Sequence, residues 1–248
     1  MQYRQKSNGL YILSREDIEQ IATEHLSAYA PRNLLHPLPL STTDFLESYL
    51  GLVVKYRYIG DFQSGILGLT VMGDEVTIPS YDDLLNPVLL KETFGTVLLS
   101  PQLLGRENEP RRRYTEMHEA SHFLLHQPYF QYCMEKAGRQ GASLPYVACR
   151  EIELREQYPR TDADWLEYQA DHLAAALLMP RGIFTTFAGH VFRKNGIRTR
   201  CLYVGPESGR QRMHAILYEI AETFTVSYQA ARIRLRQLGL MRETADTP

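Results

Sequence analysis

The chain has 248 residues, of which 44% are apolar and 23% are charged, and its formal net charge at pH 7 is −2. This length accommodates one sizeable hydrophobic core with a small appendage, and the composition is that of an ordinary globular protein. The near-neutral charge gives no electrostatic basis for binding nucleic acid or an anionic membrane. No stretch approaches the roughly 18 uninterrupted apolar residues of a membrane span.

The first residues and the cysteines bear on the cellular compartment. The segment MQYRQKSNGLYILSRED lacks the long apolar core of a secretion signal. The three cysteines, Cys133, Cys149 and Cys201, are sparse and odd in number, so they do not form a disulfide framework. We therefore expect a cytoplasmic protein that does not enter a membrane.

Two helices followed by four strands are predicted in the first part of the chain. Residues 15–29 place apolar side chains at helical spacing behind Ser14, a residue type that favours the N-cap position. The segment TDFLESYL is predicted to be a short helix that ends at Gly51. Strands separated by Gly, Asp and Pro residues follow, and their predicted ranges are 52–59, 64–72, 75–79 and 95–100.

The second part is mainly helical. One helix is predicted near residues 111–127 and should end at Gln127-Pro128, because proline disfavours the helical conformation of the residue before it. Residues 131–160 show no clean period and are expected to form an insertion or lid. A further helix should cover residues 164–178, and two more are predicted at 213–224 and 228–240.

This order of elements predicts an α+β fold, in which a small antiparallel sheet packs on the helix near 111–127 and on the helix at 164–178. We expect this domain to cover residues 1–195. The last two helices are joined by Thr225-Val226-Ser227 and look like a helix-turn-helix, so residues 196–248 are expected to form a separate helical segment.

His118, Glu119 and His122 form an HExxH motif inside a predicted helix. At 3.6 residues per turn, the two histidines lie on one face about one turn apart and can bind one metal ion. Glu119 is rotated by about 100° and can accept a proton from a water bound there without being a ligand itself. This pattern is typical of zinc-dependent hydrolases.

A catalytic zinc site usually has three protein ligands, so one more is needed. Metzincins place a histidine ten positions after the first, and here that position is Pro128, which excludes them. The other common source is a Glu on a following helix, which points to Glu167. Asp171 follows one turn later and would accept the ring N–H of a ligand histidine. Two such carboxylates repel each other unless a cation is near. The alternative is that both are solvated charges.

Other side chains are weaker candidates. Tyr114 lies one turn before His118 and is a candidate donor to the oxyanion of the reaction, with packing as the alternative. The direction of His126 drifts about 80° from that of His118, so a structural role is expected. Arg232 and Arg236 share one face of the last helix, but the segment is only weakly basic. Packing or docking of a repressor is therefore favoured over DNA binding.

Three segments in this order resemble the motifs of the ImmA/IrrE family of metallopeptidases. They are RRRYTEMHEASHFLLH, WLEYQADHLAAALLMP and ETFTVSYQAARIRLRQLGL. The matching positions include His118, Glu119, His122 and His126, then Glu167, Ala170, Asp171 and Ala174, and finally Phe224, Val226, Ser227, Arg234 and Gly239. Leu173 replaces the usual Phe, and residues 131–160 are longer than is typical. The resemblance covers about residues 15–241.

The resemblance implies a cytosolic, gluzincin-like peptidase with a zincin-like fold. Members of the family cut a DNA-binding repressor and so relieve repression, and many are encoded by mobile elements or stress regulons. The expected cofactor is Zn²⁺, with Mn²⁺ or another divalent ion as alternatives, and the expected partner is a helix-turn-helix repressor. The oligomeric state is left open.

Two rival classes stay open. One is a DNA-binding or metal-sensing regulator with a metal site that is not catalytic, and the other is an inactive interaction module. Glu119 argues against inactivity, because a purely structural site needs no general base. A structural zinc would also be expected to have four protein ligands, whereas the sequence supplies three.

Overall fold

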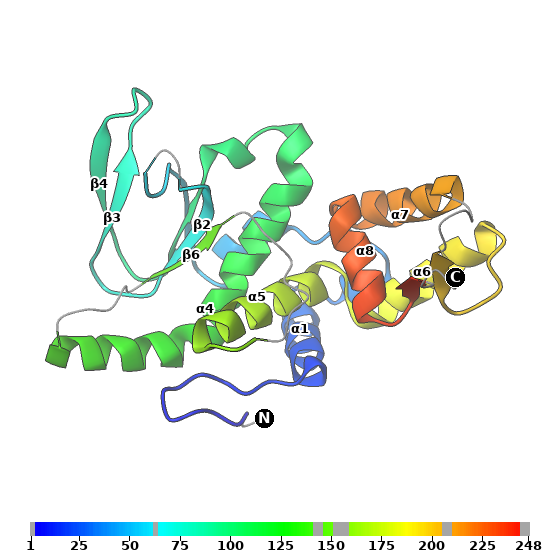
Figure 1. Ribbon diagram of the computed structural model, residues 1–248, viewed down its shortest axis with the longest axis horizontal. Helices are drawn as coiled ribbons and strands as arrows, with labels where there is room; N and C mark the ends of the chain where they lie inside the picture. Colours follow the sequence, from blue (N-terminus) through cyan, green and yellow to red (C-terminus); the bar gives the residue numbers. More distant parts are fainter. Residues whose placement is uncertain (1–2, 62–63, 141–145, 151–158, 205–209, 244–248) are drawn as a thin grey trace, which may run out of the picture. The chain divides into compact units, whose positions relative to one another are not determined.

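The computed structural model of the protein describes residues 3–61, 64–140, 146–150, 159–204 and 210–243 (Figure 1). Its contacts divide the chain into two compact units, the first with Met1–Gln20 and Ser41–Ala174 and the second with Ile21–Leu40 and Ala175–Pro248. Helices occur together with small sheets, which confirms the predicted α+β class. The predicted division into residues 1–195 and 196–248 stays a prediction.

The first unit contains a four-stranded sheet in the order β1-β5-β2-β6. Its strands are β1 Val53–Tyr56, β5 Thr96–Leu99, β2 Ile66–Val71 and β6 Tyr146–Arg150. β2 is antiparallel to β5 and to β6, but β1 and β5 are parallel, so the prediction of a purely antiparallel sheet is wrong for this pair. Between β1 and β5 the chain forms β2 and two further strands, and β5 then lies between β1 and β2 in the sheet. Such a long connection permits the parallel pairing of β1 with β5.

A separate antiparallel hairpin, β3 Val76–Tyr81 and β4 Pro87–Glu92, packs beside this sheet. The hairpin and the sheet share a buried apolar cluster, which consists of Ile59, Leu69, Val71, Val76, Ile78 and Leu98. The sequence did not predict β4. Its outward face carries Leu89, which is 69% exposed, so the alternation of apolar and polar residues that marks a half-buried strand is missing.

The long helix α4, Glu109–Gln140, contacts β2, β5 and β6 (Figure 1). The prediction that this helix ends at Gln127-Pro128 is wrong, because it continues through Pro128 to Gln140. A proline inside a helix removes one backbone hydrogen bond and usually bends or breaks the helix. Here Phe130 lies beyond the proline in a buried apolar cluster with Leu10, Met72 and Leu166, and this packing favours the helical continuation.

Part of the predicted insertion or lid at 131–160 belongs to a helix and a strand of the first unit. Residues 131–140 belong to α4, and residues 146–150 form β6 of the main sheet. The rest of the predicted insertion, residues 141–145 and 151–158, lies outside the described residues. No helix in the part of the chain that the structure describes is both long and apolar enough to cross a membrane.

Two predicted helices are confirmed as α1, Arg15–Tyr29, and α5, Asp162–Leu178. Each begins with a reciprocal cap, in which a hydroxyl accepts from the backbone N–H three residues later. Ser14 and Asp17 form this cap for α1, and Thr161 and Asp164 form it for α5. The cap places the start of α5 two residues before the predicted one.

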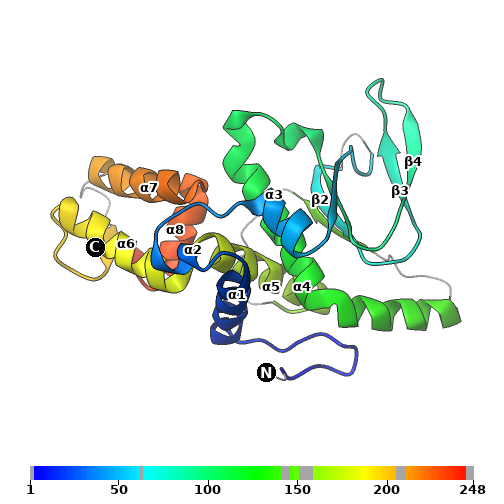
Figure 2. The same ribbon diagram turned by 180° about the vertical axis from the view of Figure 1, so that it is seen from behind.

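Shorter elements complete the first unit. They are the helix α3 Thr42–Asp44, the π-helix η1 Phe45–Tyr49, and the 3-10 helices η2 Pro101–Leu103 and η3 Arg106–Asn108. Seen from behind, α3 lies against α4 (Figure 2). The predicted helical segment that ends at Gly51 corresponds to α3 and η1, and Gly51 has the positive φ of 68° that favours glycine at a helix end.

The second unit is mainly helical. Its elements are α2 Arg32–Leu35, α6 Arg181–Lys194, α7 Arg210–Phe224, α8 Tyr228–Gln237 and the short parallel pair β7 Leu202–Val204 and β8 Met241–Glu243. α7 packs against α6 and α8, around buried aromatic side chains such as Phe184 and Phe224. The two predicted C-terminal helices are confirmed, whereas α6 was not predicted. Their helix-turn-helix character stays a prediction.

Arg234 of α8 is a buried cation in the second unit, with 2% of its surface exposed. Its Nε and Nη2 atoms donate to the Met179 carbonyl oxygen at 3.0 and 2.9 Å. Hydrogen bonds from charged donors are worth roughly 1.5–3 kcal/mol, so we expect Arg234→Leu to lower the free energy of unfolding by about that amount. Chemical denaturation measures it, with the exposed Arg212→Leu on α7 as control. Equal stability of the two variants would contradict the assignment.

Candidate metal centre

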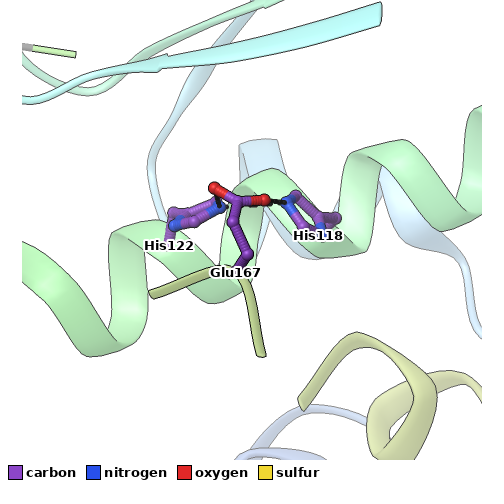
Figure 3. A group of neighbouring side chains, drawn as sticks. All are labelled: His118, His122 and Glu167. Carbon is purple, nitrogen blue, oxygen red and sulfur yellow. Dashed lines mark hydrogen bonds and ion pairs between the residues drawn. The ribbon is translucent and has the colours of Figure 1, made fainter. Parts of the chain in front are cut away.

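His118 and His122 lie one turn apart on α4 and point toward the same place (Figure 3). Both rings are buried, with 1% and 0% of their surface exposed, and their Nε2 atoms are 2.9 Å apart. Two nitrogen atoms at this distance either share a proton or direct their lone pairs at one cation. The spacing expected from the helical HExxH pattern is thus present in the structure.

Glu167 of α5 brings a carboxylate to the same place (Figure 3). Its Oε2 lies 3.4 Å from His118 Nε2, and its Oε1 lies 3.6 Å from His122 Nε2. These three side chains form a group whose donor atoms all lie within 4.8 Å of one another. With bond lengths of about 2.0–2.1 Å, tetrahedral zinc separates its ligand atoms by about 3.3 Å, so the donor set and its spacing fit a Zn²⁺ ion.

Asp171 fixes the far side of the His118 ring. Its Oδ1 is 3.0 Å from His118 Nδ1, so a proton on Nδ1 is donated to the carboxylate and Nε2 keeps its lone pair. Tyr114 donates its hydroxyl to Asp171 at 3.3 Å and is 7% exposed. The oxyanion role of Tyr114 stays a prediction, and in this structure its hydroxyl supports Asp171.

The far side of the His122 ring meets His126, whose Nδ1 lies 2.9 Å from His122 Nδ1. His126 is fully buried and lies outside the group of three donors, in agreement with a structural role. Burial lowers the pKa of His126 to about 3, although its hydrogen bond to Gln169 opposes this shift. Burial also lowers the pKa of His122 well below its usual value, helped by the neighbouring histidines. Neutral imidazole is the form that binds metals.

Glu119 points from α4 toward strand β2. Its Oε2 accepts a hydrogen bond of 2.6 Å from the Thr70 hydroxyl, whereas its buried Oε1 has no hydrogen-bond partner. Burial raises the pKa of Glu119 to about 7, while His118 and the bond from Thr70 lower it and Glu167 raises it. Glu119 thus interacts with two of the three converging donors and keeps one buried oxygen without a partner, which a bound water or metal ion would explain.

Strand β2 leaves room for this carboxylate at Gly68. A Cβ atom built on Gly68 would lie 2.5 Å from Glu119 Oε1 and 2.7 Å from Thr115 Cγ2. Sequence reasoning did not assign a role to Gly68 or Thr70. A glycine inside a strand is a sign of close approach by another group, but the group cannot be identified without the register between β2 and α4.

We therefore expect Gly68→Ala to displace the Glu119 carboxylate and to destabilise the protein. Overpacking of a buried site typically costs about 1–3 kcal/mol. Unfolding by denaturant measures the change, and Gly182→Ala on α6 is the matched control, because a Cβ there meets nothing within 4 Å. If Gly68→Ala were as stable as Gly182→Ala, the close packing of Glu119 against β2 would be refuted.

Two histidines of an HExxH helix and a glutamate of a following helix are a donor set of the kind that HExxH metallopeptidases use, and here they lie in a mixed α+β fold. The family model of the IrrE N-terminal-like domain, peptidase family M78, matches residues 146–236. This match confirms the resemblance to ImmA/IrrE family metallopeptidases. It indicates a peptidase and implies a divalent metal, with zinc as the expected ion. No curated protein matches the chain.

Proposed function

We propose that the protein is a zinc-dependent endopeptidase that cuts a cytosolic helix-turn-helix repressor and thereby relieves repression. One observation carries the proposal: the donor atoms of His118, His122 and Glu167 converge, and the buried Glu119, which interacts electrostatically with His118 and Glu167, has one carboxylate oxygen without a partner. The M78 match supports a metallopeptidase in general. The repressor as substrate rests on the resemblance to the ImmA/IrrE family.

The residues that would hold the ion are His118, His122 and Glu167. A divalent ion bound by them supplies Lewis acidity, which lowers the pKa of water from about 15.7 toward 7 and polarises the peptide carbonyl. Zn²⁺ suits two imidazoles and one carboxylate, and Mn²⁺ is an alternative. Asp171 keeps the His118 ring in the orientation that presents Nε2.

Glu119 acts as the general base and then as the general acid. Its Oε1, the oxygen without a partner, accepts the proton of the attacking water as the new C–O bond forms. Thr70 holds the other oxygen in place through its hydroxyl. The proton then passes to the amine nitrogen as the C–N bond breaks. Burial raises the pKa of this carboxyl group, which helps it to take up and release a proton, whereas a bound cation would lower that pKa.

The rival interpretation is a regulator that binds DNA or senses metal through a site that is not catalytic. Within the described residues, the cluster supplies three protein donors. Three donors are typical of catalytic zinc, and four are typical of structural zinc. The half-buried Arg232 and Arg236 of α8 would serve repressor docking in our proposal and DNA contacts in the rival one.

We expect about one Zn²⁺ per chain, and we expect the His118→Ala/His122→Ala double variant and Glu167→Ala to lose it, because each removes donor atoms. Asp171→Ala should retain the ion with about 10–100-fold weaker affinity, since it only supports a ligand. Metal content after dialysis and competition with a chromophoric chelator measure both effects. Full occupancy in the double variant would exclude this site, and loss from Asp171→Ala with retention by Glu167→Ala would exchange the two roles.

We expect Glu119→Gln to bind Zn²⁺ and substrate normally but to lose cleavage by at least about 10²–10⁴-fold, because the amide cannot accept the proton. The assay mixes the purified chain with a helix-turn-helix repressor encoded next to it and detects fragments by mass spectrometry. Gln131→Glu, an exposed change on α4, is the control. Undiminished cleavage by Glu119→Gln would refute the base. Salt-sensitive, sequence-specific duplex binding without repressor cleavage would favour the regulator instead.

A further inference from the structure

A buried line of polar groups runs from the main chain of the N-terminal segment to His122. Gln169 Nε2 lies 2.7 Å from the Tyr11 carbonyl oxygen, and Gln169 Oε1 lies 3.2 Å from His126 Nε2. His126 Nδ1 lies 2.9 Å from His122 Nδ1. The side chains of Gln169, His126 and His122 are all 0% exposed, so none of these contacts is shared with bulk water.

The direction of every hydrogen bond in this line follows from its fixed end. A carbonyl oxygen can only accept, so the amide nitrogen of Gln169 faces Tyr11 and donates. The amide oxygen of Gln169 therefore faces His126 and must receive a proton from Nε2. A neutral imidazole that carries its proton on Nε2 has a lone pair on Nδ1.

The same logic then fixes His122. The lone pair on His126 Nδ1 accepts a hydrogen bond, so the proton of His122 is on Nδ1. His122 Nε2 is left with a lone pair, and this atom faces Glu167 Oε1 at 3.6 Å and His118 Nε2 at 2.9 Å. Only this tautomer can bind a metal ion at Nε2.

We propose that His126 and Gln169 are positioning residues that hold His122 in its metal-binding tautomer, with the Tyr11 carbonyl as the fixed end of the relay. This inference rests on the proposed metal site. It gives His126 a role other than that of a ligand, because both of its ring nitrogens are already engaged. For His118, Asp171 takes the place that His126 has for His122. One ligand histidine is thus oriented by a carboxylate and the other by a neutral imidazole.

The N-terminal segment is itself anchored, which makes the Tyr11 carbonyl a fixed reference. Lys6 Nζ and Asn8 Nδ2 each lie 2.6 Å from an oxygen of Asp162 at the start of α5. Gly9 passes so close to α4 that a Cβ there would lie 2.6 Å from the Pro128 carbonyl oxygen. The relay therefore connects residues before α1 to the metal site through α5 and α4.

The first test needs no variant and no metal. Long-range ¹H–¹⁵N correlation spectra of the metal-free full chain distinguish the two imidazole tautomers. The expected result is a proton on Nε2 of His126, with its Nδ1 unprotonated and accepting from His122. The His126 ring decides the test, because His118 Nε2 and His122 Nε2 lie 2.9 Å apart and share a proton when no cation is bound. A proton on Nδ1 of His126 would overturn the relay whether or not the protein is a peptidase.

The second test measures Zn²⁺ affinity by competition with a chelator. His126→Leu removes the acceptor for His122 and should weaken Zn²⁺ binding by about 10–100-fold. His126→Asn offers an amide oxygen near the former Nδ1 position and should restore most of the affinity. Gln169→Leu should weaken binding less than His126→Leu does, because it acts one group further away.

Gln127→Leu is the matched control for Gln169→Leu. Gln127 also donates to a backbone carbonyl, that of Phe123 at 2.8 Å, but its amide contacts neither histidine. It should bind Zn²⁺ like the unaltered chain. Unchanged affinity in His126→Leu, or equal losses in His126→Leu and His126→Asn, would overturn the positioning role. If the unaltered chain bound no Zn²⁺, the proposed function would fail while the tautomers still decided the relay.

Discussion

The arrangement of β2 and α5 around α4 in the first unit depends on the need of buried polar groups for hydrogen-bond partners. α4 carries polar side chains with at most 1% exposure at positions 115, 116, 118, 119, 121, 122 and 126. A buried donor or acceptor without a partner costs roughly 1–3 kcal/mol, so each of these side chains needs a partner. Thr115 and Ser121 donate to backbone carbonyls of α4 itself, and other elements supply partners for the rest. β2 supplies Thr70 for Glu119, and α5 supplies Asp171 for His118 and Gln169 for His126. Oε1 of Glu119 is the exception among the atoms named here, because it is buried and has no hydrogen-bond partner.

The two carboxylates of α5 are accommodated by one imidazole. Glu167 and Asp171 are four residues apart on one helix face, where like charges repel each other. In the structure they contact opposite nitrogens of His118, with Glu167 at Nε2 and Asp171 at Nδ1. The ring therefore separates the two charges, and a proton on Nδ1 is attracted to Asp171. A cation at Nε2 would in turn be attracted to Glu167, so both carboxylates favour the same tautomer.

Local patterns in the sequence predicted the parts of this arrangement that depend on one helix alone. The spacing of His118 and His122 requires only helical geometry. The apolar period of residues 164–178 predicted the helix α5, which carries Glu167. The partners across elements could not be predicted in this way. Thr70 depends on the register of β2 against α4, and the contact of Tyr11 with Gln169 joins residues 158 positions apart. For the same reason, the parallel pairing of β1 with β5 and the continuation of α4 past Pro128 were missed.

The family match and the HExxH motif come from different parts of the chain. The matched residues, 146–236, include Glu167 and Asp171 but not the HExxH motif at residues 118–122. The match alone therefore supports a peptidase family, but the matched residues do not contain the motif that would perform the chemistry. In the structure, α4 and α5 of the first unit bring the two parts within 3.4 Å, at His118 Nε2 and Glu167 Oε2. A helix from outside the matched region thus completes the donor set, and this contact links the family resemblance to a specific chemical site.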